Sequence, residues 1–413
     1  MIDTRRDILI ATQSYVPDSA AVGQYLAEVA EGLAGRGWRV TVVAPERGYN
    51  EPEVRLTSEM GERGNPRIRR VKGPANRKGS LGDRLGGMIV FSIRAMLRAL
   101  TQRSLDGMLV SSSPPILPLF MTAVARLRRL PLVYWVMDLN PDQATASGHV
   151  SASSWSARLL AASQRWVMSR AATVVVLDRF MEARVRRYLP CPRPLVTLPL
   201  WPLDVGPAGD DSRAFRSRHG LTERFVIMHS GNHSPVHPLD TLLDAARILG
   251  QDARFKFLFV GGGLAKAAIE EARTRENLEN VLLLPSQPLG ALSAVLGAAD
   301  VHVVSMGENM AGCVHPSKVY NILSAGRPFV LLGPASCSLN DLLQRFGCGW
   351  RIAHGDTDGF VRLLQHLASP EGSMELERMR GAAGRVYETR IEAARGRMEF
   401  LDTVEDALGA GRS

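Results

Sequence analysis

The feature that most constrains the fold is an alternation of short apolar runs with segments of helical length, and this alternation occurs twice along the chain. The short runs are rich in β-branched residues, as buried strands are, and strands that alternate with helices form parallel sheets through crossover connections. In the first series we expect strands at residues 7–12, 39–44, 107–111, 132–137 and 173–177. In the second series we expect them at residues 225–230, 255–260, 281–284, 301–305 and 329–332.

Prolines concentrate between the two series, at residues 189–207, and we place the interdomain linker there. A length of 413 residues also favours two domains over one. The sequence therefore predicts an α/β protein with two facing Rossmann-like, doubly wound domains at residues 1–200 and 201–385. Residues 386–413 are expected to form a helix that packs back on the first domain. Ligands bind at the carboxyl ends of such strands, so we expect a cleft between the two sheets.

Cysteine usage and apolar runs indicate the compartment. Four cysteines are scattered without a CxxC pair, which argues against a disulfide framework and against a zinc site. The first residues lack the apolar core of a signal peptide, and the longest apolar stretch, residues 116–125, is too short to span a bilayer. We therefore expect a cytoplasmic protein whose contact with a membrane is at most peripheral.

Positive charge is concentrated in one part of the chain. The net charge is +9, and residues 63–103 contain eleven basic residues and a single acidic residue, Asp83. Such a segment attracts nucleic acid, anionic lipid or phosphorylated substrates, or is simply a solvated surface. No nucleic-acid recognition module accompanies it, so we expect no nucleic-acid partner.

Within this basic segment, residues 81–103 predict an apolar helix in which Arg84, Arg94 and Arg98 are interspersed. Arg94 and Arg98 are four residues apart and share one face of the helix. Two interpretations stay open. The helix either packs against the sheet, or it rests on the anionic inner leaflet of the membrane and brings a polyprenyl-linked lipid to the cleft.

Three segments at expected strand ends have the composition of an anion site. They are Ser230-Gly231-Asn232-His233, Gly261-Gly262-Gly263 and Val314-His315-Pro316-Ser317-Lys318. Glycine lets backbone N–H groups approach a phosphate, and a helix N-terminus offers unpaired donors. Lys318 adds a full positive charge at the start of the helix that follows. Each glycine cluster taken alone could equally serve the steric needs of a turn between strand and helix.

The order of these segments resembles one family. The segments SGN (230–232), DTLLDAA (240–246), FLFVGGG (257–263), LPSQP (284–288), AADVHVVS (298–305) and HPSKVYNILSAGRP (315–328) resemble the donor half of the GT-B-fold, retaining, family 4-like glycosyltransferases. Within that family they look most like the branch that builds bacterial envelope and capsule polysaccharides. Residues 14–45 and 133–144 resemble parts of its acceptor half. The resemblance covers most of the chain apart from residues 51–105 and the last forty or so.

The resemblance implies transfer of a sugar, with retention, from a nucleoside-diphosphate sugar, here interpreted as a UDP-sugar, to a lipid-linked or small glycoside acceptor. No metal or other cofactor is implied, because Lys318 can stabilise the leaving diphosphate. The implied catalytic residues are Lys318, Asp138 and Glu308. The implied donor-binding residues are Gly231, Asn232, His237, Gly262, Gly263, Ser286, Gln287, His315, Ser317, Lys318 and Asn321, and the implied acceptor-binding residues are Gln13, Tyr15, Asp18, Gly23 and Asp142.

The chain departs from the family pattern around the expected phosphates. Cys313 and Asn321 stand where many members have two glutamates, and Asn232 and His237 stand where they have Arg and Lys. Lys318 is therefore expected to be the chief cation of the donor site.

The half that resembles the family's acceptor domain also departs from the family pattern, and two of its candidate residues have an alternative structural role. Met137 stands where many relatives have His. Asp138 and Asp142 follow an expected strand, and for both residues helix capping is the alternative to a functional role. Histidines without ligand spacing are expected to be structural; these are His219, His229, His302 and His354.

Two other functions stay open at this stage. A sugar-nucleotide 2-epimerase uses the same architecture, but it needs carboxylates near the sugar, and residues 305–325 contain few. A catalytically inactive nucleotide-sugar-binding protein would fit the missing glutamates. An assay for transfer of a sugar to an acceptor distinguishes the glycosyltransferase from the epimerase and from the inactive binding protein.

Overall fold

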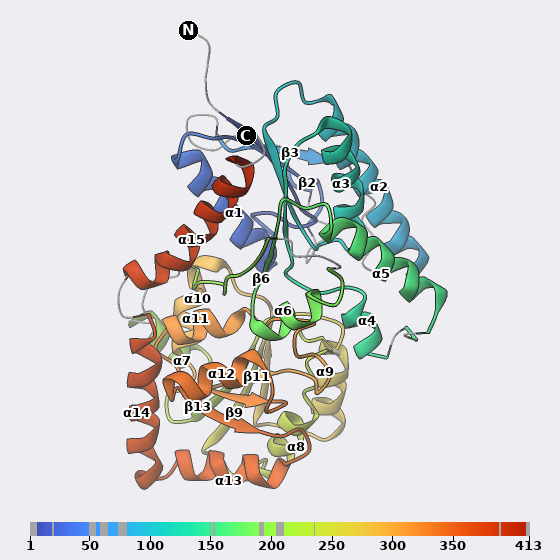
Figure 1. Ribbon diagram of the computed structural model, residues 1–413. Helices are drawn as coiled ribbons and strands as arrows, with labels where there is room; N and C mark the ends of the chain where they lie inside the picture. Colours follow the sequence, from blue (N-terminus) through green and yellow to red (C-terminus); the bar gives the residue numbers. More distant parts are fainter. Residues whose placement is uncertain are drawn as a thin grey trace. The chain divides into compact units, whose positions relative to one another are not determined.

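The computed structural model describes residues 6–18, 20–48, 55–57, 65–72, 81–148, 150–151, 153–189, 194–203, 210–234, 236–387 and 390–409. The chain divides into two compact units (Figure 1). The first unit contains Met1–Pro199, Gly312–His315 and Arg395–Ser413, and the second contains Leu200–Ala311 and Pro316–Ala394. The chain therefore passes between the units several times.

A seven-stranded, fully parallel sheet forms the centre of the first unit. Its strands are β1 (Asp7–Ala11), β2 (Arg39–Pro45), β3 (Arg67–Val71), β4 (Gly107–Ser111), β5 (Leu132–Trp135), β6 (Thr173–Val176) and β7 (Leu195–Thr197). Their order in the sheet is β3-β2-β1-β4-β5-β6-β7. All five strands expected in this half are present.

The two edge strands of this sheet were not predicted from the sequence. In β3 the sequence RIRRV places arginines among the apolar residues, and only Ile68 and Val71 are buried. β7 has three half-buried residues and lies within the proline-rich stretch. An edge strand pairs on one side only, so it needs neither the length nor the apolar run that identifies a central strand.

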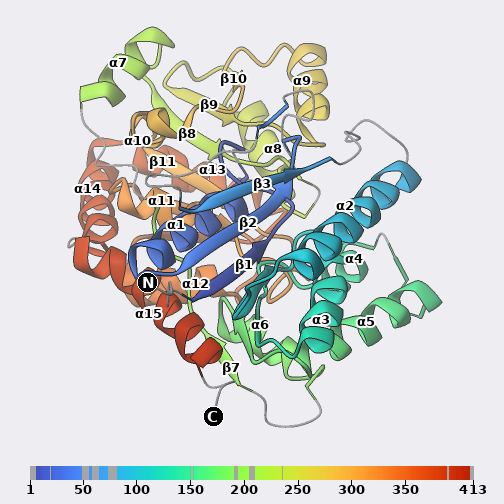
Figure 2. The same ribbon diagram turned by 90° about the horizontal axis from the view of Figure 1, so that it is seen from above.

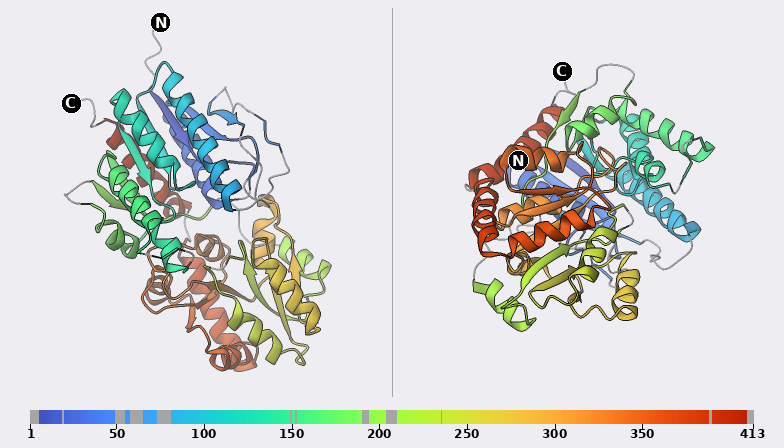
Figure 3. Two further views of the ribbon diagram at one scale, coloured as in Figure 1. Left: turned by 90° about the vertical axis from the view of Figure 1, so that its right-hand side faces the viewer. Right: turned by 90° about the horizontal axis from the view of Figure 1, so that it is seen from below.

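Helices cover both faces of this sheet. The helices are α1 (Ala21–Gly35), α2 (Leu81–Thr101), α3 (Leu117–Arg128), α4 (Asp142–Ala146), α5 (Trp155–Met168), α6 (Arg179–Val185) and α15 (Arg390–Gly409). α1 and α15 lie on one side of the sheet (Figure 2), whereas α2, α3 and α5 lie side by side on the other (Figures 2 and 3). Among the described helices, none combines the length and the apolar character needed to cross a bilayer.

The C-terminal helix α15 is integrated into the first unit from Arg395 onward. The ring of Phe400 lies 4.1 Å from that of Trp135, and Phe400 is 1% exposed. Arg36 at the end of α1 pairs with Asp402 and Glu405, each at 2.6 Å. An aromatic contact in the core and ion pairs at its rim thus hold the last helix against the beginning of the chain.

We predict that Phe400→Ala lowers the free energy of unfolding of the first unit by about 3 to 5 kcal/mol, because it removes a buried ring and leaves a cavity beside Trp135. Met398→Ala on the same helix removes a side chain that is 53% exposed and should change stability by less than about 0.5 kcal/mol. Urea unfolding followed by circular dichroism measures both. Equal stability of the two variants would mean that α15 does not contribute to the core of the first unit.

The second unit repeats the sheet order of the first. Its strands are β8 (Phe225–Ser230), β9 (Phe255–Val260), β10 (Val281–Leu284), β11 (Val301–Ser305), β12 (Phe329–Leu332) and β13 (Gly349–Ile352), all parallel in the order β10-β9-β8-β11-β12-β13. The expected strands are confirmed, and β13 was missed because it is another partly exposed edge strand. The chain is thus an α/β protein with two Rossmann-like sheets, as the sequence predicts.

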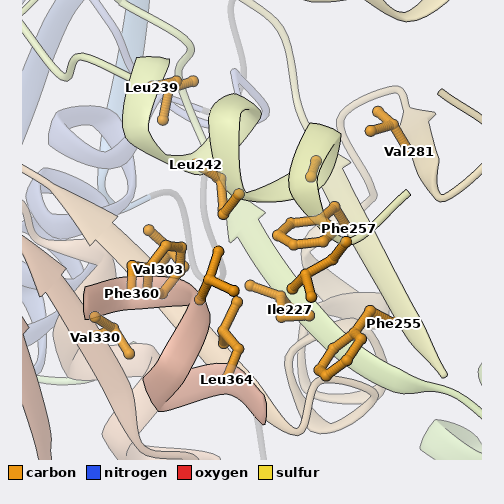
Figure 4. Close-up of a cluster of buried hydrophobic side chains, with 14 of the residues drawn as sticks. Ile227, Leu239, Leu242, Phe255, Phe257, Val281, Val303, Val330, Phe360 and Leu364 are labelled. Atoms are coloured by element: carbon orange, nitrogen blue, oxygen red, sulfur yellow. The ribbon is translucent and has the colours of Figure 1, made fainter. Parts of the chain in front are cut away.

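Two hydrophobic cores flank the second sheet. Alternate residues of β8 point to opposite faces, so Ile227 joins one core and Met228 the other. On the first face, α8 (Asp240–Ile248) and α13 (Thr357–Leu367) cover Phe255 and Phe257 (Figure 4). α7 (Asp210–Arg218) and α10 (Leu292–Gly297) cover the other face. The remaining elements are α9 (Lys266–Arg275), the short 3-10 helix η2 (Leu289–Ala291), α11 (Lys318–Ser324), α12 (Ser338–Phe346) and α14 (Pro370–Arg385).

The strand order identifies where each sheet can bind a ligand. In both units the first and fourth strands in chain order are neighbours, β1 beside β4 and β8 beside β11, and the connections on either side run in opposite directions. A crevice opens outside the carboxyl ends of two such strands. In the second unit these ends are Ser230 and Ser305. Gly231 follows Ser230 directly, and Gly261-Gly262-Gly263 follow the neighbouring strand β9.

Candidate functional site

Three loops at the carboxyl edge of the second sheet are hydrogen-bonded to one another in sequence. Gly231 N–H donates to the Val260 carbonyl at 2.8 Å, and Gly261 N–H donates to the Leu284 carbonyl at 3.0 Å. His233 N–H then donates to the Gly262 carbonyl at 2.7 Å. The loops after β8 and β9 are therefore fixed to each other beyond the ends of their strands.

The three consecutive glycines, Gly261, Gly262 and Gly263, differ in whether the surrounding atoms leave room for a side chain. Gly261 has φ +136°, and a Cβ there would lie 2.1 Å from the carbonyl oxygen of Gly231. Gly263 has φ +134°, and its Cβ would lie 2.3 Å from the carbonyl oxygen of His233. Nothing lies within 4 Å of a Cβ built on Gly262. Loop packing thus explains Gly261 and Gly263, whereas Gly262 faces open space that a ligand can enter.

Lys318 lies over the backbone of Gly231. Its Nζ would be 3.2 Å from a Cβ on Gly231 and is 3.4 Å from Nε2 of His229. His229 is fully buried, and its Nδ1 lies 3.1 Å from the Val303 carbonyl, so Nδ1 carries the proton and donates. The lone pair of His229 Nε2 therefore faces the ammonium group.

The electrostatics of this cluster favour an anion. Burial lowers the pKa of Lys318 to about 7, and among the described residues no carboxylate pairs with it. Burial, followed by the charge of Lys318, lowers the pKa of His233 to about 4 and of His237 to about 3, and that of His229 well below its usual value. The histidines are therefore neutral at physiological pH, and Lys318 carries the positive charge of the cluster.

Helix α11 and the loop after β8 add polar groups to this cluster. The helix has seven residues, and Ser317 at its N-cap makes no side-chain capping hydrogen bond. Asn321 accepts a hydrogen bond from Leu203 N–H through Oδ1 at 2.9 Å, which leaves its Nδ2 for other partners. His237 donates from Nδ1 to the Ser305 carbonyl at 2.8 Å, so it contributes a neutral ring beside β11.

The remaining donor-side candidates lie along the same edge. Asn232 is exposed beside Gly263. Ser286 is exposed after β10, and the Gln287 side chain donates to the Pro285 carbonyl at 2.9 Å. Glu308 is exposed after β11. The structure thus gathers the second-unit candidates at consecutive strand ends of one sheet.

In the first unit, the loop after β1 is strongly packed. Gln13 N–H donates to the Ser113 carbonyl at 3.0 Å, which places Gln13 where β1 and β4 end side by side. Tyr15 is 1% exposed and Asp18 accepts a hydrogen bond from Ala20 N–H at 3.0 Å. A Cβ on Gly23 would lie 2.7 Å from Ser14 Oγ. Tyr15, Asp18 and Gly23 therefore shape this loop, and Gln13 is the partly exposed member of the group.

Asp138 and Asp142 have different surroundings. The backbone N–H of Asp138 donates to Ser112 Oγ at 3.0 Å, and burial raises the pKa of its partly exposed carboxyl to about 6 while His315 opposes the rise. The Asp142 carboxylate accepts a hydrogen bond from the Tyr188 hydroxyl and lies 3.4 Å from the Arg184 guanidinium. Asp138 is thus the carboxyl with a perturbed pKa, whereas Asp142 is held by two neighbours.

Two residues of these sites were not predicted from the sequence. His229, expected to be structural, supports Lys318 from inside β8. Asp178 binds His315, with Oδ2 2.7 Å from Nδ1. Asp178 lies two residues after the end of strand β6 and caps α6, which is the only signal that its sequence position offers. His315 itself belongs to the first unit, apart from the donor-side residues with which the sequence grouped it.

Comparison with known proteins agrees with this architecture. Residues 20–201 match the family model of the glycosyl transferase 4-like domain, and residues 224–369 match that of the glycosyl transferases group 1. The chain belongs to the family 4-like glycosyltransferases. The transferase is 25% identical over 358 residues to WcaI of Escherichia coli (strain K12), named as a colanic acid biosynthesis glycosyl transferase, with 82% of this chain and 86% of WcaI covered.

Two further relatives point the same way. WbjE of Pseudomonas aeruginosa, also named as a glycosyltransferase, is 23% identical over 280 residues, which cover 67% of the transferase and 69% of WbjE. HepE of Anabaena, solved with UDP and glucose and also with UDP-glucose, superposes with a TM-score of 0.73 at 15% identity in the first of these complexes. That superposition covers 97% of the transferase and 100% of HepE, and it supports the GT-B fold.

We predict that Gly261→Ala lowers the free energy of unfolding of the transferase by at least about 2 kcal/mol, because a side chain there adopts a left-handed φ and meets the Gly231 carbonyl. Gly262→Ala, its neighbour, should be tolerated to within about 1 kcal/mol. Urea unfolding compares the two variants. If Gly261→Ala were as stable as the wild-type protein, the two loops would not be packed as described.

Proposed function

We propose that the transferase moves a sugar from a UDP-sugar to a lipid-linked or small glycoside acceptor, with retention and without a metal. The observation that carries this proposal is Lys318, a partly buried cation over the Gly231 backbone with no carboxylate partner among the described residues. A diphosphate is the anion that such a cation and the open backbone at Gly262 would suit. The complexes of HepE with UDP and UDP-glucose support a nucleotide-sugar donor.

In this proposal the second unit holds the donor. Glycosyl transfer breaks the bond between the sugar and the diphosphate, and negative charge develops on the leaving oxygen. Protonated Lys318 stabilises that charge, with the backbone at Gly231 and Gly262 close to the phosphates. Ser286 and Gln287 at the end of β10 border the base, and Glu308 after β11 lies toward the sugar.

The first unit would hold the acceptor. Asp138 has the raised pKa expected of a group that exchanges a proton near neutrality, and it follows strand β5 next to the loop of Ser112. In its ionised form it accepts a hydrogen bond, or the proton, from the acceptor hydroxyl. Gln13 is a further polar group at the carboxyl edge of this sheet.

We predict that UDP binding weakens as pH rises from 7 to 9. The anion favours the ammonium form of Lys318, whose pKa in the free protein is about 7, so above that pH each binding event must take up a proton. The dissociation constant should therefore rise by up to about tenfold for each pH unit. Titration calorimetry in two buffers of different ionisation enthalpy measures both the affinity and the proton uptake.

Two variants serve as controls for this measurement. Lys318→Arg keeps a charge that does not titrate, so its UDP affinity should be independent of pH over the same range. Lys318→Met should bind UDP weakly at every pH, and its turnover with a UDP-sugar should fall by at least about a hundredfold. Wild-type turnover in Lys318→Met would refute the proposal.

The helix α2 carries a stripe of large apolar side chains on its exposed side. Leu85, Ile89, Ile93 and Leu97, each four residues from the next, are 37 to 52% exposed. The buried side of the same helix includes Phe91 and the small residues Ser92, Ala95 and Ala99. An ordinary amphipathic helix has the reverse arrangement.

Neighbouring helices extend this surface. Exposed large apolar side chains occur on α3 at Leu127 and on α5 at Trp155 and Leu159, at 63 to 77%. α2, α3 and α5 lie side by side (Figure 3). The sequences of α3 and α5 contain no acidic residue, and α2 contains Asp83 alone. Exposed arginines are interleaved with the apolar residues: Arg94, Arg98, Arg126, Arg158 and Arg165.

We infer that this surface, defined by the exposed residues of α2, α3 and α5, binds the anionic inner leaflet of the cytoplasmic membrane. Apolar side chains enter the headgroup region while the arginines contact anionic lipids, which is the composition of interfacial helices. The buried side of α2 packs against β2, β3 and α3, as one interpretation of residues 81–103 expects. The exposed stripe on the other side supports the proposed membrane contact as well. The side chain of Arg84, the third arginine expected on this helix, lies outside the described residues.

We predict that the wild-type protein sediments with vesicles containing phosphatidylglycerol and stays free of pure phosphatidylcholine vesicles. Ile93→Glu/Leu97→Glu should weaken vesicle binding by at least about tenfold, because two apolar side chains are lost and two negative charges are added. Met374→Glu on α14, which replaces a residue that is 77% exposed in the second unit, should bind as the wild-type protein does.

Sedimentation velocity without vesicles completes this experiment. A wild-type dimer that Ile93→Glu/Leu97→Glu converts to a monomer would assign the surface to a second copy of the chain. Equal binding to neutral and anionic vesicles would also contradict the inference, since the arginines would then play no part.

A further inference from the structure

The turn that joins β9 to α9 is packed around the backbone of His233. His233 N–H donates to the Gly262 carbonyl at 2.7 Å, and the His233 carbonyl accepts from Ala265 N–H at 3.0 Å. A Cβ on Gly263 would lie 2.3 Å from the His233 carbonyl oxygen and 2.7 Å from its backbone nitrogen. Lys266 N–H donates to the Gly263 carbonyl at 3.3 Å. The loop after β8 and the start of α9 are therefore one packed structure.

The ring of His233 is buried without a hydrogen-bond partner among the residues that the structure describes. His233 is 0% exposed, and neither Nδ1 nor Nε2 has a partner. The ring packs on those of Phe259 and His229, with centroid distances of 6.1 and 5.4 Å. His229 Nε2 in turn lies 3.4 Å from Lys318 Nζ. The unpartnered imidazole thus contacts the histidine that supports the proposed phosphate cation.

Other histidines of the chain do not share this property. Each has a ring nitrogen within 3.1 Å of a protein oxygen; these are His229, His237, His302, His315 and His354. A polar group that is buried without a partner destabilises the folded protein, because it has lost its hydrogen bonds to water. A hydrogen-bond partner supplied by a ligand would remove that cost at His233.

The first turn of α9 has the charge that an anion requires. The helix has ten residues, Ala265 at its N-cap makes no side-chain capping hydrogen bond, and the first turn contains no acidic residue. The helix begins instead with Lys266, whose ammonium group is unfavourable at the positive end of the helix dipole. Lys266 is partly exposed, and no carboxylate of the described part of the chain pairs with it. An anion bound here would offset both unfavourable features.

The second unit contains three lysines, and two of them lie at its carboxyl edge. Lys256 is near the start of β9, where it donates to the Glu279 carbonyl at 2.6 Å. Lys266 follows the end of the same strand, and Lys318 lies over Gly231. Burial, followed by the charges of Lys318 and Lys266, lowers the pKa of His233 to about 4, which agrees with a neutral ring close to both cations.

We propose that the start of α9 is a second anion subsite of the donor site, where Lys266 and the open backbone at Gly262 bind one phosphate of the nucleotide sugar and the His233 ring hydrogen-bonds to it. This inference rests on the proposed function, in which Lys318 binds the diphosphate. A neutral imidazole donates to a phosphate oxygen from one ring nitrogen. Because only packing holds the His233 ring, the ring can turn toward that oxygen. Lys266 and Lys318 then share the charge of the diphosphate.

The first experiment measures binding of pyrophosphate and of UDP to the full-length protein by titration calorimetry. Lys266→Met removes the charge of the side chain and Lys266→Arg retains it. Lys256→Met, at the other end of β9, is the matched control. We expect Lys266→Met to weaken binding of both ligands at least about fivefold, because one of two cations is lost. Lys266→Arg and Lys256→Met should bind within about twofold of the wild-type protein.

A pair of histidine variants tests the buried ring. His233→Leu replaces an unpartnered imidazole by an apolar side chain, so the urea midpoint should stay unchanged or rise while UDP affinity falls at least about fivefold. His302→Leu, near the start of β11, leaves the Leu296 carbonyl without the ring that lies 2.9 Å from it. It should lower the urea midpoint and leave UDP affinity within about twofold.

Three results would overturn the inference: wild-type affinity for pyrophosphate in Lys266→Met, unchanged UDP affinity in His233→Leu, or a lower urea midpoint in His233→Leu. The last result would mean that the ring stabilises the protein without a ligand. A wild-type protein that binds neither UDP nor pyrophosphate would defeat the proposed function as well. If the wild-type protein binds both and Lys318→Met alone loses affinity, the proposed function stands and only this inference fails.

Discussion

The constraint on which the proposed donor site depends is the burial of one cation, Lys318, without a carboxylate partner among the described residues. Removing an ammonium group from water is costly, and among the described residues no carboxylate offsets that cost for Lys318. The surrounding groups instead keep the site open to an anion. His229 offers a lone pair, the neighbouring histidines stay neutral, and Gly231 presents bare backbone beneath the ammonium.

The loops around Lys318 are held by their own backbone and not by the ligand. Hydrogen bonds continue from β8 to β9 and from β9 to β10 beyond the last residue of each strand. Gly261 and Gly263 allow the loops to approach at distances that a side chain would prevent. A site that is ordered in this way loses little entropy when a phosphate binds, which is the physical benefit of preorganisation.

In the first unit the corresponding feature is the Asp138 carboxyl, whose pKa is raised toward neutrality at the end of an apolar strand. Asp138 is partly buried, and burial raises the pKa of its carboxyl to about 6 while His315 opposes the rise. His315 in turn is hydrogen-bonded to Asp178. His315 and Lys318 are three residues apart, yet they belong to different units. One short segment, HPSK, thus contributes side chains to both units.

Sequence alone determined the fold class and the central strands, because buried parallel strands need continuous apolar runs and the intervening helices need their own periodicity. It also gave Lys318 as a candidate, because a full positive charge at the start of a helix, beside glycine-rich strand ends, has the composition of an anion site. Only the tertiary structure decided that Gly261 and Gly263 serve packing, that Asp142 is occupied by Tyr188 and Arg184, and that α2 exposes its apolar side. The edge strands β3, β7 and β13, and the pairing of Asp178 with His315 across 137 residues, were likewise invisible in the sequence. One physical reason accounts for all of these. The local sequence pattern indicates the secondary structure and burial that a residue favours, whereas the packing of distant segments determines which residues it contacts.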